Sequence, residues 1–532
     1  MNMKQIGGFF DGLARRIEAE AGIYLILACW IFFAVTGIRA GHTTFWLDEL
    51  FTIHLCALPR FIDVWNALRA GIDLNPPFQY VAVRSAQAIF GSGPLAIRLP
   101  VLAGYLVMSV SIYLFLRRRL PLPMAFAGMM LPWLAGTYRF ALDARPYGIL
   151  LGCSGVALLC WARAAGTERP RRAALTGLWV SITLALLTHY YAVLLALPFL
   201  LGEWRRFTER RKPDWPMWTT LALSALPVAI YPLVFQVEKG QTSRLWPFHV
   251  TWLTGPDAYR YLLEPLVWPL LVGAALSLAS GKSPAGECGR GKGMTGAELA
   301  ALIGFALIPA AAAGLAAATT GSFEPRYGAP GVLGVACLLP WMGTRYGPGK
   351  AARNGAVFAT VFLVFFTAGF LWKLWEATQR PAVVHAAKLP NGSSPAAPEI
   401  LGYPLIGRVP PGNLPLVLAN AAAFLEVGYY AGDDLARRLY YVTDPNLALR
   451  RTGSSGIDLI LSKMQRLPSV KGHIEAAGPF LAEHPRFLIY YCGQFTEWLV
   501  GELQERGWKL RLLDREGPAK LAEVTAPLTD GH

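Results

Sequence analysis

Ten runs without a charged residue occur within the first 372 residues of the chain, and each contains at least 17 residues. A helix needs roughly 20 apolar residues to cross the hydrocarbon core of a bilayer, with about 17 as the lower limit. The sequence therefore predicts a polytopic α-helical membrane protein. The runs are Ala21–Ile38, Leu99–Leu116, Leu120–Tyr138, Pro146–Ala162, Ala173–Gly202, Trp215–Val237, Pro265–Gly281, Leu299–Phe323, Tyr327–Thr344 and Asn354–Trp372.

The composition excludes several other classes of protein. With 54% hydrophobic and 16% charged residues, the chain is too apolar to be disordered. Seven cysteines among 532 residues are too few for a disulfide scaffold, and no CxxC motif or Cys/His cluster indicates zinc. The first run follows Lys4, Arg15 and Arg16, as in a signal peptide. No small-x-small cleavage site follows it, so we expect a retained first helix.

The formal charge of +15 is distributed in a way that predicts the topology. One set of gaps between the runs carries 21 basic and nine acidic residues, net +12, whereas the alternate gaps are net +2 and the region from Lys373 onward is net +1. Cytoplasmic loops are enriched in Lys and Arg. We therefore place the first set in the cytoplasm together with the N-terminus, and we attribute the charge to orientation rather than to nucleic-acid binding. The basic clusters of this first, cytoplasmic set begin at Lys4, Arg117, Arg163, Arg205, Lys282 and Arg345.

Two segments decide the predicted number of crossings. Ala173–Gly202 has 30 residues with basic clusters at both ends, so two short helices with a tip near His189 fit better than one helix. Asn75–Phe90 is apolar but short and contains Arg84, and counting it as a crossing would place all later basic clusters outside. We expect it to lie on the outer surface. The prediction is about 11 transmembrane helices and an extracytoplasmic C-terminus.

After Trp372 the composition becomes that of a soluble domain. Residues 380–415 are rich in Pro, Gly, Ser and Ala, as is typical of a linker. Short apolar runs then alternate with helical stretches, which predicts an α/β domain with a mainly parallel sheet and, without GxGxxG or Walker motifs, no nucleotide site. The expected strands are Leu416–Ala419, Leu439–Thr443, Phe487–Tyr491 and Leu510–Leu513, and the expected helices lie near 421–431, 456–466, 471–483 and 495–506.

The predicted organisation is therefore a transmembrane domain followed by a soluble one. The transmembrane catalytic domain covers residues 1–380 and contains an outer-side juxtamembrane loop at 41–97. A linker at 381–415 leads to an extracytoplasmic α/β domain at 416–532. The soluble domain is expected to pack on the membrane domain or to cover it.

Polar residues next to the apolar runs fall mostly on the predicted outer side. Loops far apart in sequence would thus meet at one face, as an active site between lipid and water requires. Asp48 and Glu49 lie between Trp46 and Phe51, in an aromatic belt at the membrane interface. A carboxylate there is partly desolvated, which suits general-base catalysis. The residues are Asp48, Glu49, Asp143, Arg145, Tyr147, His189, Tyr190, Tyr191, Glu324, Arg326 and Tyr327.

Each of these residues also has a purely structural interpretation. Asp48 and Glu49 could form a solvated loop pair, and Asp143 could cap the helix that follows it. His189 could be a buried, hydrogen-bonded histidine. Arg326 could be an interfacial anchor, or it could bind a phosphate. No pair has the spacing of metal ligands, so the sequence assigns no metal residues and leaves a divalent metal open.

Six motifs stand in the order seen in bacterial family 39 glycosyltransferases, and the chain resembles these GT-C membrane enzymes over about residues 20–345. It is similar to protein O-mannosyltransferases and to the aminoarabinose transferase of lipid A, and its tail looks like the α/β extension of some bacterial members. The motifs are Trp46-Leu47-Asp48-Glu49, Asn75-Pro76-Pro77-Phe78-Gln79-Tyr80, Arg98-Leu99-Pro100, Asp143-Ala144-Arg145-Pro146-Tyr147, Thr188-His189-Tyr190-Tyr191 and Arg326-Tyr327.

The resemblance implies a multi-pass enzyme of the bacterial inner membrane. It would transfer a hexose or pentose from a polyprenyl-phosphate donor to a hydroxyl of a lipid, glycan or protein, with inversion. Asp48 matches the first-loop aspartate that the family uses as catalytic base. Glu49 and Asp143 would stabilise an oxocarbenium-like transition state. Arg145, His189 and Arg326 would stabilise the leaving phosphate. Tyr147, Tyr190 and Tyr327 join them as candidate substrate-binding residues.

One position departs from the family pattern. The family commonly has His-Pro-Pro where this chain has Asn75-Pro76-Pro77. An asparagine cannot carry a proton in catalysis, so Asn75 is expected to orient a substrate. The two prolines should still fix the start of the surface helix.

Two other functions fit part of the pattern. A transporter or flippase of a lipid-linked glycan would show paired repeats and charged or broken helices near the midplane, whereas these runs carry no charge and the polar groups cluster at one end. An oligosaccharide ligase, which moves a whole polyprenyl-linked glycan, would share the same site. The expected partners are the lipid donor, the acceptor and the bilayer.

Overall fold

The computed structural model describes residues 3–166, 171–231, 250–280, 293–346, 350–379, 403–494 and 497–527. The chain forms two compact units. The first comprises Met1–Thr43, Asn75–Pro232 and Val250–Lys373, and the second comprises Thr44–Leu74, Leu233–His249 and Leu374–His532. The sequence predicted a boundary near 380 but did not predict that residues 44–74 group with the C-terminal part. Most of the predicted linker, at 380–402, lies outside the described residues.

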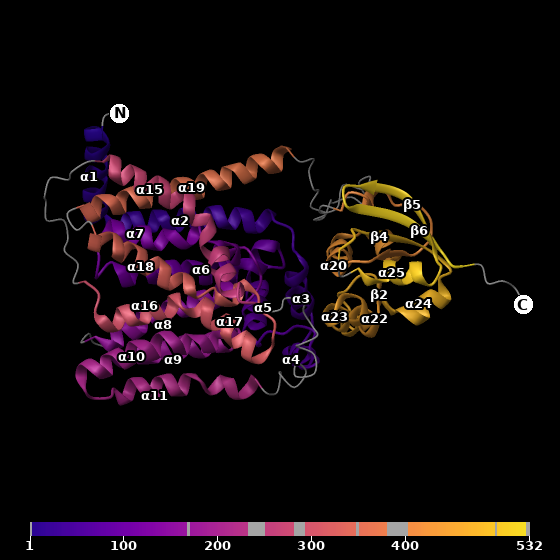
Figure 1. The fold of residues 1–532 in the computed structure, drawn as a ribbon, viewed down its shortest axis with the longest axis horizontal. Helices are drawn as coiled ribbons and strands as arrows, with labels where there is room; N and C mark the ends of the chain where they lie inside the picture. Colours follow the sequence, from indigo (N-terminus) through magenta and orange to yellow (C-terminus); the bar gives the residue numbers. More distant parts are fainter. Residues whose placement is uncertain are drawn as a thin grey trace, which may run out of the picture. The chain divides into compact units, whose positions relative to one another are not determined.

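The first unit is helical, and Figure 1 shows its long helices running side by side. Its α-helices are α1 (Met3–Ala19), α2 (Ala21–His42), α5 (Phe78–Phe90), α6 (Pro94–Leu116), α7 (Leu122–Met130), α8 (Tyr147–Ala165), α9 (Arg171–Leu186), α10 (Ala196–Arg210), α11 (Trp215–Ser224), α14 (Thr254–Leu263), α15 (Val267–Ala279), α16 (Gly296–Ala306), α17 (Ile308–Thr319), α18 (Gly331–Tyr346) and α19 (Ala351–Gln379). Its 3-10 turns are η1 (Leu131–Trp133), η2 (Gly136–Ala141), η3 (Tyr190–Leu195), η4 (Leu226–Ile230), η5 (Glu264–Leu266) and η6 (Pro325–Gly328).

Several of these helices meet the length and apolarity that a membrane crossing requires. Among the described residues, five spans do so, and the pair α16 and α17, bent by 50°, would make a sixth. Other apolar runs form shorter or broken helices, so the structure does not confirm the count of 11 crossings. The run Ala173–Gly202 is broken between α9 and α10 at the predicted tip, and Asn75–Phe90 contains the short helix α5.

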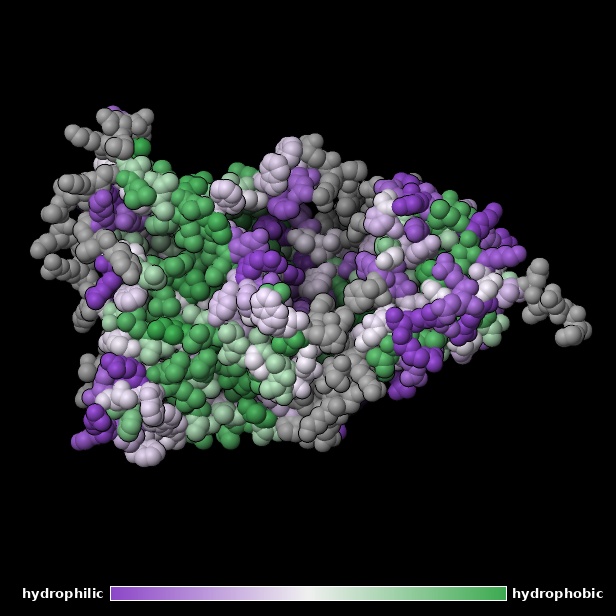
Figure 2. Space-filling model, in the orientation of Figure 1, coloured by the Kyte–Doolittle hydropathy of each residue, from purple (hydrophilic) through white to green (hydrophobic). Residues whose placement is uncertain are grey.

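Apolar side chains cover the outside of the helical unit. Figure 2 shows a broad hydrophobic band across this unit, with hydrophilic side chains toward the two ends of its helices. A soluble protein seldom exposes apolar patches of this extent, so the band indicates a lipid-facing surface. The exposed residues include Ile26, Trp30, Trp179, Trp204, Leu223, Trp268, Leu278, Val364 and Leu371.

Glycines let the two central helices α6 and α8 approach closely. A Cβ on Gly104 of α6 would lie 2.5 Å from the carbonyl oxygen of Gly148, and a Cβ on Gly152 would lie 2.6 Å from that of Gly104. Small residues commonly allow such backbone contact between helices in membranes. The contact fixes the start of α8, where Tyr147 lies.

The six basic gaps of the sequence meet at one end of the helical unit. Ion pairs join Arg119 to Glu298 and Arg171 to Asp214. Asp11 lies 3.6 Å from Arg353, whose guanidinium also donates to the carbonyl of Ser280. Further contacts join Glu18 to Leu122, and Gly296 to Arg205 and Glu209. Loops that the charge pattern assigned to one side therefore lie together; Arg169, Lys282, Arg290 and Lys292 are outside the described residues.

The second unit contains two short helices from the first loop and a sheet-containing domain. Within the described residues its helices are α3 (Leu47–Cys56), α4 (Phe61–Arg69), the 3-10 turn η8 (Ile406–Arg408), α20 (Ala421–Tyr430), α21 (Asp433–Ala436), α22 (Pro445–Thr452), α23 (Gly456–Met464), α24 (Ala477–Glu483) and α25 (Trp498–Glu505). Its strands are β1 (Leu416–Leu418), β2 (Leu439–Thr443), β3 (His473–Ala476), β4 (Arg486–Tyr491), β5 (Lys509–Glu516) and β6 (Ala519–Thr525).

The sheet has the order β3-β2-β1-β4-β6-β5, with helices on both faces. Its first four strands are parallel, and β6 and β5 add an antiparallel hairpin. One face packs Val417, Val442 and Ile489 against α22, α24 and α25. The prediction of an α/β domain is confirmed. The prediction of one helix over 471–483 was wrong, because its first part forms the edge strand β3.

The glycine contact predicts a stability effect. Gly104→Ala places a methyl group against the backbone of α8, so we expect a loss of about 1–3 kcal/mol in the free energy of unfolding. Gly22→Ala on α2 is the matched control, because a Cβ there meets nothing within 4 Å. Denaturant unfolding of the purified protein in detergent measures both, and equal stability of the two variants would contradict the packing described.

The basic loops at one end of the helical unit predict that this end faces the cytoplasm. In a cysteine-free background, Arg118→Cys should react with an impermeant maleimide only after the cells are opened, because positive loops remain in the cytoplasm. Ser85→Cys, exposed on α5, should react in intact spheroplasts. Labelling of Arg118→Cys in intact spheroplasts would contradict the predicted topology and place this loop outside the cell.

Candidate functional site

Loops far apart in sequence meet at one end of the helical unit. The Phe78 amide donates to the Leu187 carbonyl at 3.0 Å, and Gln79 Nε2 donates to the Ala144 carbonyl at 2.7 Å. These bonds join the start of α5 to the turns before α8 and after α9. The segments that the sequence assigned to the outer side therefore lie together in this unit, apart from the Asp48 loop, which belongs to the second unit.

Aromatic rings and arginines form a partly buried group at this junction, the arginine–aromatic cluster of Arg145, Tyr147, His189, Tyr191, Arg326 and Tyr327. The His189 ring lies 5.0 Å from the Tyr147 ring and 5.7 Å from the Tyr327 ring, measured between centroids. Tyr191 and Tyr327 stack at 4.4 Å. Three loops thus supply one continuous aromatic surface with two guanidinium groups.

His189 holds this cluster together in an uncharged state. Its Nδ1 accepts the backbone N–H of Tyr191 at 3.2 Å, which places the proton of the neutral ring on Nε2. The charges of Arg145 and Arg326 both act on the ring. Burial and two nearby positive charges disfavour an imidazolium, so the cations available to an anionic ligand are the two arginines rather than His189.

Arg326 is oriented by a carboxylate and by an aromatic ring. Its Nε lies 2.7 Å from Glu324 Oε2, and its Nη2 donates to Glu324 Oε1 at 2.9 Å. The guanidinium lies over the Tyr147 ring, 5.8 Å from its centroid. Gly328 and Gly331 pack on Pro309 of α17, where a Cβ would come within 2.8 Å, and this fixes the turn η6 that carries Arg326.

Three other predicted site residues lie around the cluster. Asp143 is buried in the turn before α8, where its carbonyl accepts the N–H of Arg145 at 2.6 Å. Asn75 is buried just before α5. Tyr190 packs edge-to-face on Tyr231 at 4.8 Å, so its ring has a different partner from those of the cluster.

Sequence reasoning missed two residues of this region. The guanidinium of Arg139 lies 6.0 Å from the Tyr261 ring centroid, and the charges of Arg326 and Asp143 also act on Tyr261. Both lie in gaps that the topology placed on the same side as the cluster, which was the available signal. Neither belongs to a motif of the resemblance.

Asp48 and Glu49 lie at the start of α3 in the second unit and differ in exposure. Glu49 is fully buried, and its Oε2 accepts the backbone N–H of Trp46 at 3.4 Å. Asp48 precedes it and is half-buried. Neighbouring helix residues point about 100° apart, so Glu49 supports the helix while Asp48 keeps access to solvent.

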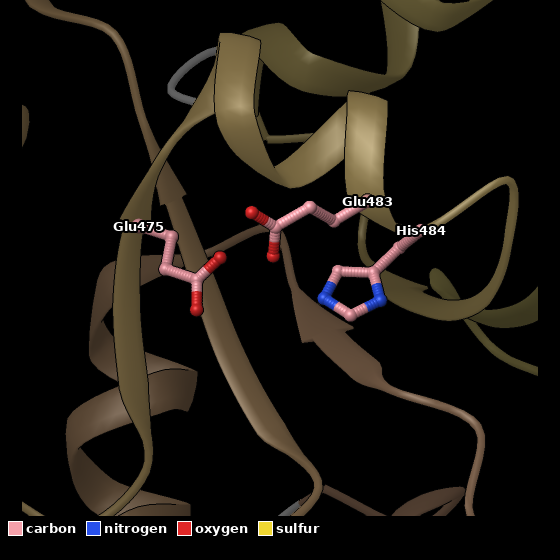
Figure 3. Close-up of side chains that lie close together, drawn as sticks. All are labelled: Glu475, Glu483 and His484. Carbon is pink, nitrogen blue, oxygen red and sulfur yellow. The ribbon is translucent and has the colours of Figure 1, made fainter.

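The second unit also holds three residues that could bind a metal ion. Figure 3 shows Glu475 of β3, Glu483 at the end of α24 and His484 directing their side chains toward a common point. One ligand atom from each lies within 4.8 Å of the others. Two carboxylates and an imidazole suit a divalent transition metal with water completing its coordination. None of the three belongs to the predicted site, and we assign them no catalytic role.

Comparisons with known proteins agree with the predicted class. The profile of the dolichyl-phosphate-mannose-protein mannosyltransferase family matches residues 75–231. The structure is similar to ArnT from Cupriavidus metallidurans in the apo state, with a TM-score of 0.54 and 14% identity over 94% of this chain and 98% of that one. The same protein bound to undecaprenyl phosphate gives the same TM-score and identity over 95% and 98%.

The Archaeoglobus fulgidus oligosaccharyltransferase gives a TM-score of only 0.36, at 13% identity over 95% of this chain and 74% of that one, and supports no argument. No curated protein matches the chain in sequence.

The predicted resemblance to GT-C glycosyltransferases of the family 39 kind is confirmed by the family match and the shared fold. The fold is that of a multi-pass membrane protein with an appended α/β domain. At this identity the structural likeness establishes the fold alone.

Proposed function

We propose that the protein is a membrane glycosyltransferase that moves a sugar from a polyprenyl phosphate to an acceptor hydroxyl on the outer face of the bacterial inner membrane. The observation that carries the proposal is the GT-C fold across nearly the whole chain, combined with a partly buried arginine–aromatic cluster at one end of the helices. The related transferase was solved with undecaprenyl phosphate, which supports a donor of this class.

Asp48 is proposed as the general base. Its half-buried carboxylate, in the first turn of α3, would take the proton of the acceptor hydroxyl as that oxygen attacks the anomeric carbon. The bond between the anomeric carbon and the donor's phosphate oxygen breaks, and its electron pair leaves with the lipid phosphate. The new bond forms on the opposite face of the sugar, so configuration is inverted.

The arginines are proposed to stabilise the leaving phosphate. A guanidinium fork matches phosphate oxygens in a bidentate way and stays charged at any physiological pH. Arg326 is preorganised by Glu324 and Tyr147, and Arg145 lies close enough to act on the same histidine. The tyrosines and Asn75 would bind the sugar, while Glu49 and Asp143 would stabilise positive charge on the ring.

An apolar cavity of about 380 Å³ lies beside the cluster in the helical unit. Leu186, Ala192, Phe199, Trp218 and Leu221 are among its lining residues, from α9, η3, α10 and α11. Ala192 follows Tyr191 directly, so one end of the cavity lies next to the cluster. We assign it to the first isoprene units of the donor, because a hydrocarbon chain is most stable among such side chains.

The role of Asp48 predicts a loss of activity without a loss of folding. Asp48→Asn should lower kcat by at least about 100-fold, because general-base catalysis contributes 10²–10⁴-fold. The assay is release of undecaprenyl phosphate in proteoliposomes given undecaprenyl-phosphate-linked pentoses and hexoses, with envelope lipids and glycans as acceptors. Asp434→Asn, a highly exposed aspartate of the same unit, is the control. Full activity of Asp48→Asn would exclude it as the base.

The role of Arg326 predicts a binding effect that needs no knowledge of the sugar. Arg326→Ala should weaken binding of undecaprenyl phosphate about tenfold or more, because a hydrogen bond to a charged group contributes about 1.5–3 kcal/mol. Arg326→Lys should fall between, since it keeps the charge but not the fork. The control is Arg260→Ala on the exposed side of α14. Unchanged affinity in Arg326→Ala would remove the arginine from the phosphate site.

A further inference from the structure

The start of α3 is held by side chains of α20, which lie 379 and 385 residues away in sequence. The first N–H groups of a helix have no partner inside it. The Leu47 N–H, the first of α3, donates to Glu426 Oε1 at 3.0 Å, and the Phe45 N–H donates to the Tyr430 hydroxyl oxygen at 2.9 Å. The Trp46 N–H donates to Glu49, so three consecutive backbone N–H groups donate to side-chain oxygens.

Glu426 and Tyr430 lie one turn apart on α20, so both project from the same face of that helix. The negative carboxylate also lies at the positive end of the α3 dipole. Asp48 is the next residue along the chain after Leu47. Any shift in the contact between Leu47 and Glu426 therefore moves the Asp48 carboxylate directly.

The rest of α3 is anchored to the same domain. Phe45 packs edge-to-face on Tyr429 with centroids 5.7 Å apart, and Tyr429 also contacts the His54 ring. His54 Nδ1 lies 2.9 Å from the Ser469 hydroxyl in the loop before β3. Burial lowers the pKa of His54 to about 4, so this histidine is neutral and its bond does not change near pH 7.

Glu426 is the titratable member of this set. The pKa of Glu426 is raised to about 7, mainly by burial and in smaller part by the charge of Glu49, against the opposing effect of the hydrogen bonds from Tyr403 and Leu47. The Tyr403 hydroxyl donates to Oε2 at 3.1 Å. Tyr490 and Cys492 lie behind Tyr403. The carboxylate is a stronger acceptor than the acid, so deprotonation tightens both bonds.

We propose that Glu426 and Tyr430 are positioning residues of the transferase, through which the C-terminal α/β domain fixes the catalytic Asp48, and that the ionisation of Glu426 adjusts how firmly it is fixed. This inference rests on the proposed role of Asp48. It gives the α/β domain a role in the reaction, whereas the sequence favoured a domain that only packs on the membrane domain or covers it.

The proposal predicts that activity and stability change in opposite directions as the pH falls. The folded pKa of Glu426 lies above the unfolded value, so the folded state binds the proton more tightly. Through this group, stability should rise as pH falls from about 7 toward the unfolded value near 4.5, while activity falls over the same range. If Glu426 had only a structural role, its protonation would change stability and activity in the same direction.

The experiment compares the full-length wild type with Glu426→Gln, Glu426→Ala and Tyr430→Phe in detergent. Glu426→Gln should lose the activity step near pH 7, and Glu426→Ala should lower kcat about tenfold with donor KM unchanged. Amide hydrogen exchange over residues 45–50 should accelerate in Glu426→Ala and Tyr430→Phe. Glu505→Gln, an exposed glutamate at the end of α25 in the same domain, is the matched control.

The outcomes distinguish this inference from the proposed function. Unchanged exchange in Glu426→Ala and Tyr430→Phe would overturn the positioning contact, whatever the activity. Faster exchange with wild-type kcat and an unchanged pH profile would show a purely structural contact and also overturn it. If Asp48→Asn keeps full activity, the proposed function fails, while the exchange result still reports on the contact. Tyr430→Phe keeps the test informative if Glu426→Ala does not fold.

Discussion

Each helix that leaves a bilayer ends in carbonyl groups without helical partners, and the arrangement of this protein depends on how one such end is closed. At the end of α2, the fully buried guanidinium of Arg98 donates to the carbonyls of Ala40 and Thr43, both at 2.7 Å. Its charge also lies at the negative end of the helix dipole. The first span therefore stops at a defined residue, and the chain enters the Asp48 loop from a fixed point.

The proposed reaction places opposite demands on the groups of the two units. A leaving phosphate needs cations that keep their charge and position, and the helical unit would supply Arg145 and also Arg326, which is held by Glu324 and the Tyr147 ring. A base needs a carboxylate that can exchange protons with solvent, and α3 supplies it beside the fully buried Glu49. Rigid backbone contacts hold the first group, and side chains of α20 hold the second.

Charge and hydropathy predicted those parts of the fold that follow from solvation. Basic gaps far apart in sequence, such as those of Arg119 and Glu298, were placed on one side by their charge alone, and the structure brings them together. The break near His189 followed from run length and flanking charge. The ring contacts of Tyr147, His189 and Tyr327 join three loops that topology had assigned to one face.

What the sequence could not predict depends on contacts without a local signature. The contact between α3 and α20 includes the bond from Leu47 to Glu426, and neither the short apolar sequence of α3 nor a single glutamate indicates such a pair. Strand β3 was not predicted, because His473–Ala476 leads without a break into the apolar pattern of α24 and the two were interpreted as one helix. For Tyr261 the topology indicated the side of the membrane but not the neighbours, because Arg139, Asp143 and Arg326 come from other gaps.

The attachment of the first loop to α20 bears on how such proteins diverge and how they can be recombined. Residues 44–74 and the C-terminal domain form one compact unit although the whole helical bundle is encoded between them. Substitutions at Phe45 or Leu47 and at Glu426 or Tyr430 are then under joint selection. A hybrid of two homologues would keep its parts matched if the exchange points fell near Thr43, Asn75 and Lys373, so that loop and domain come from the same parent.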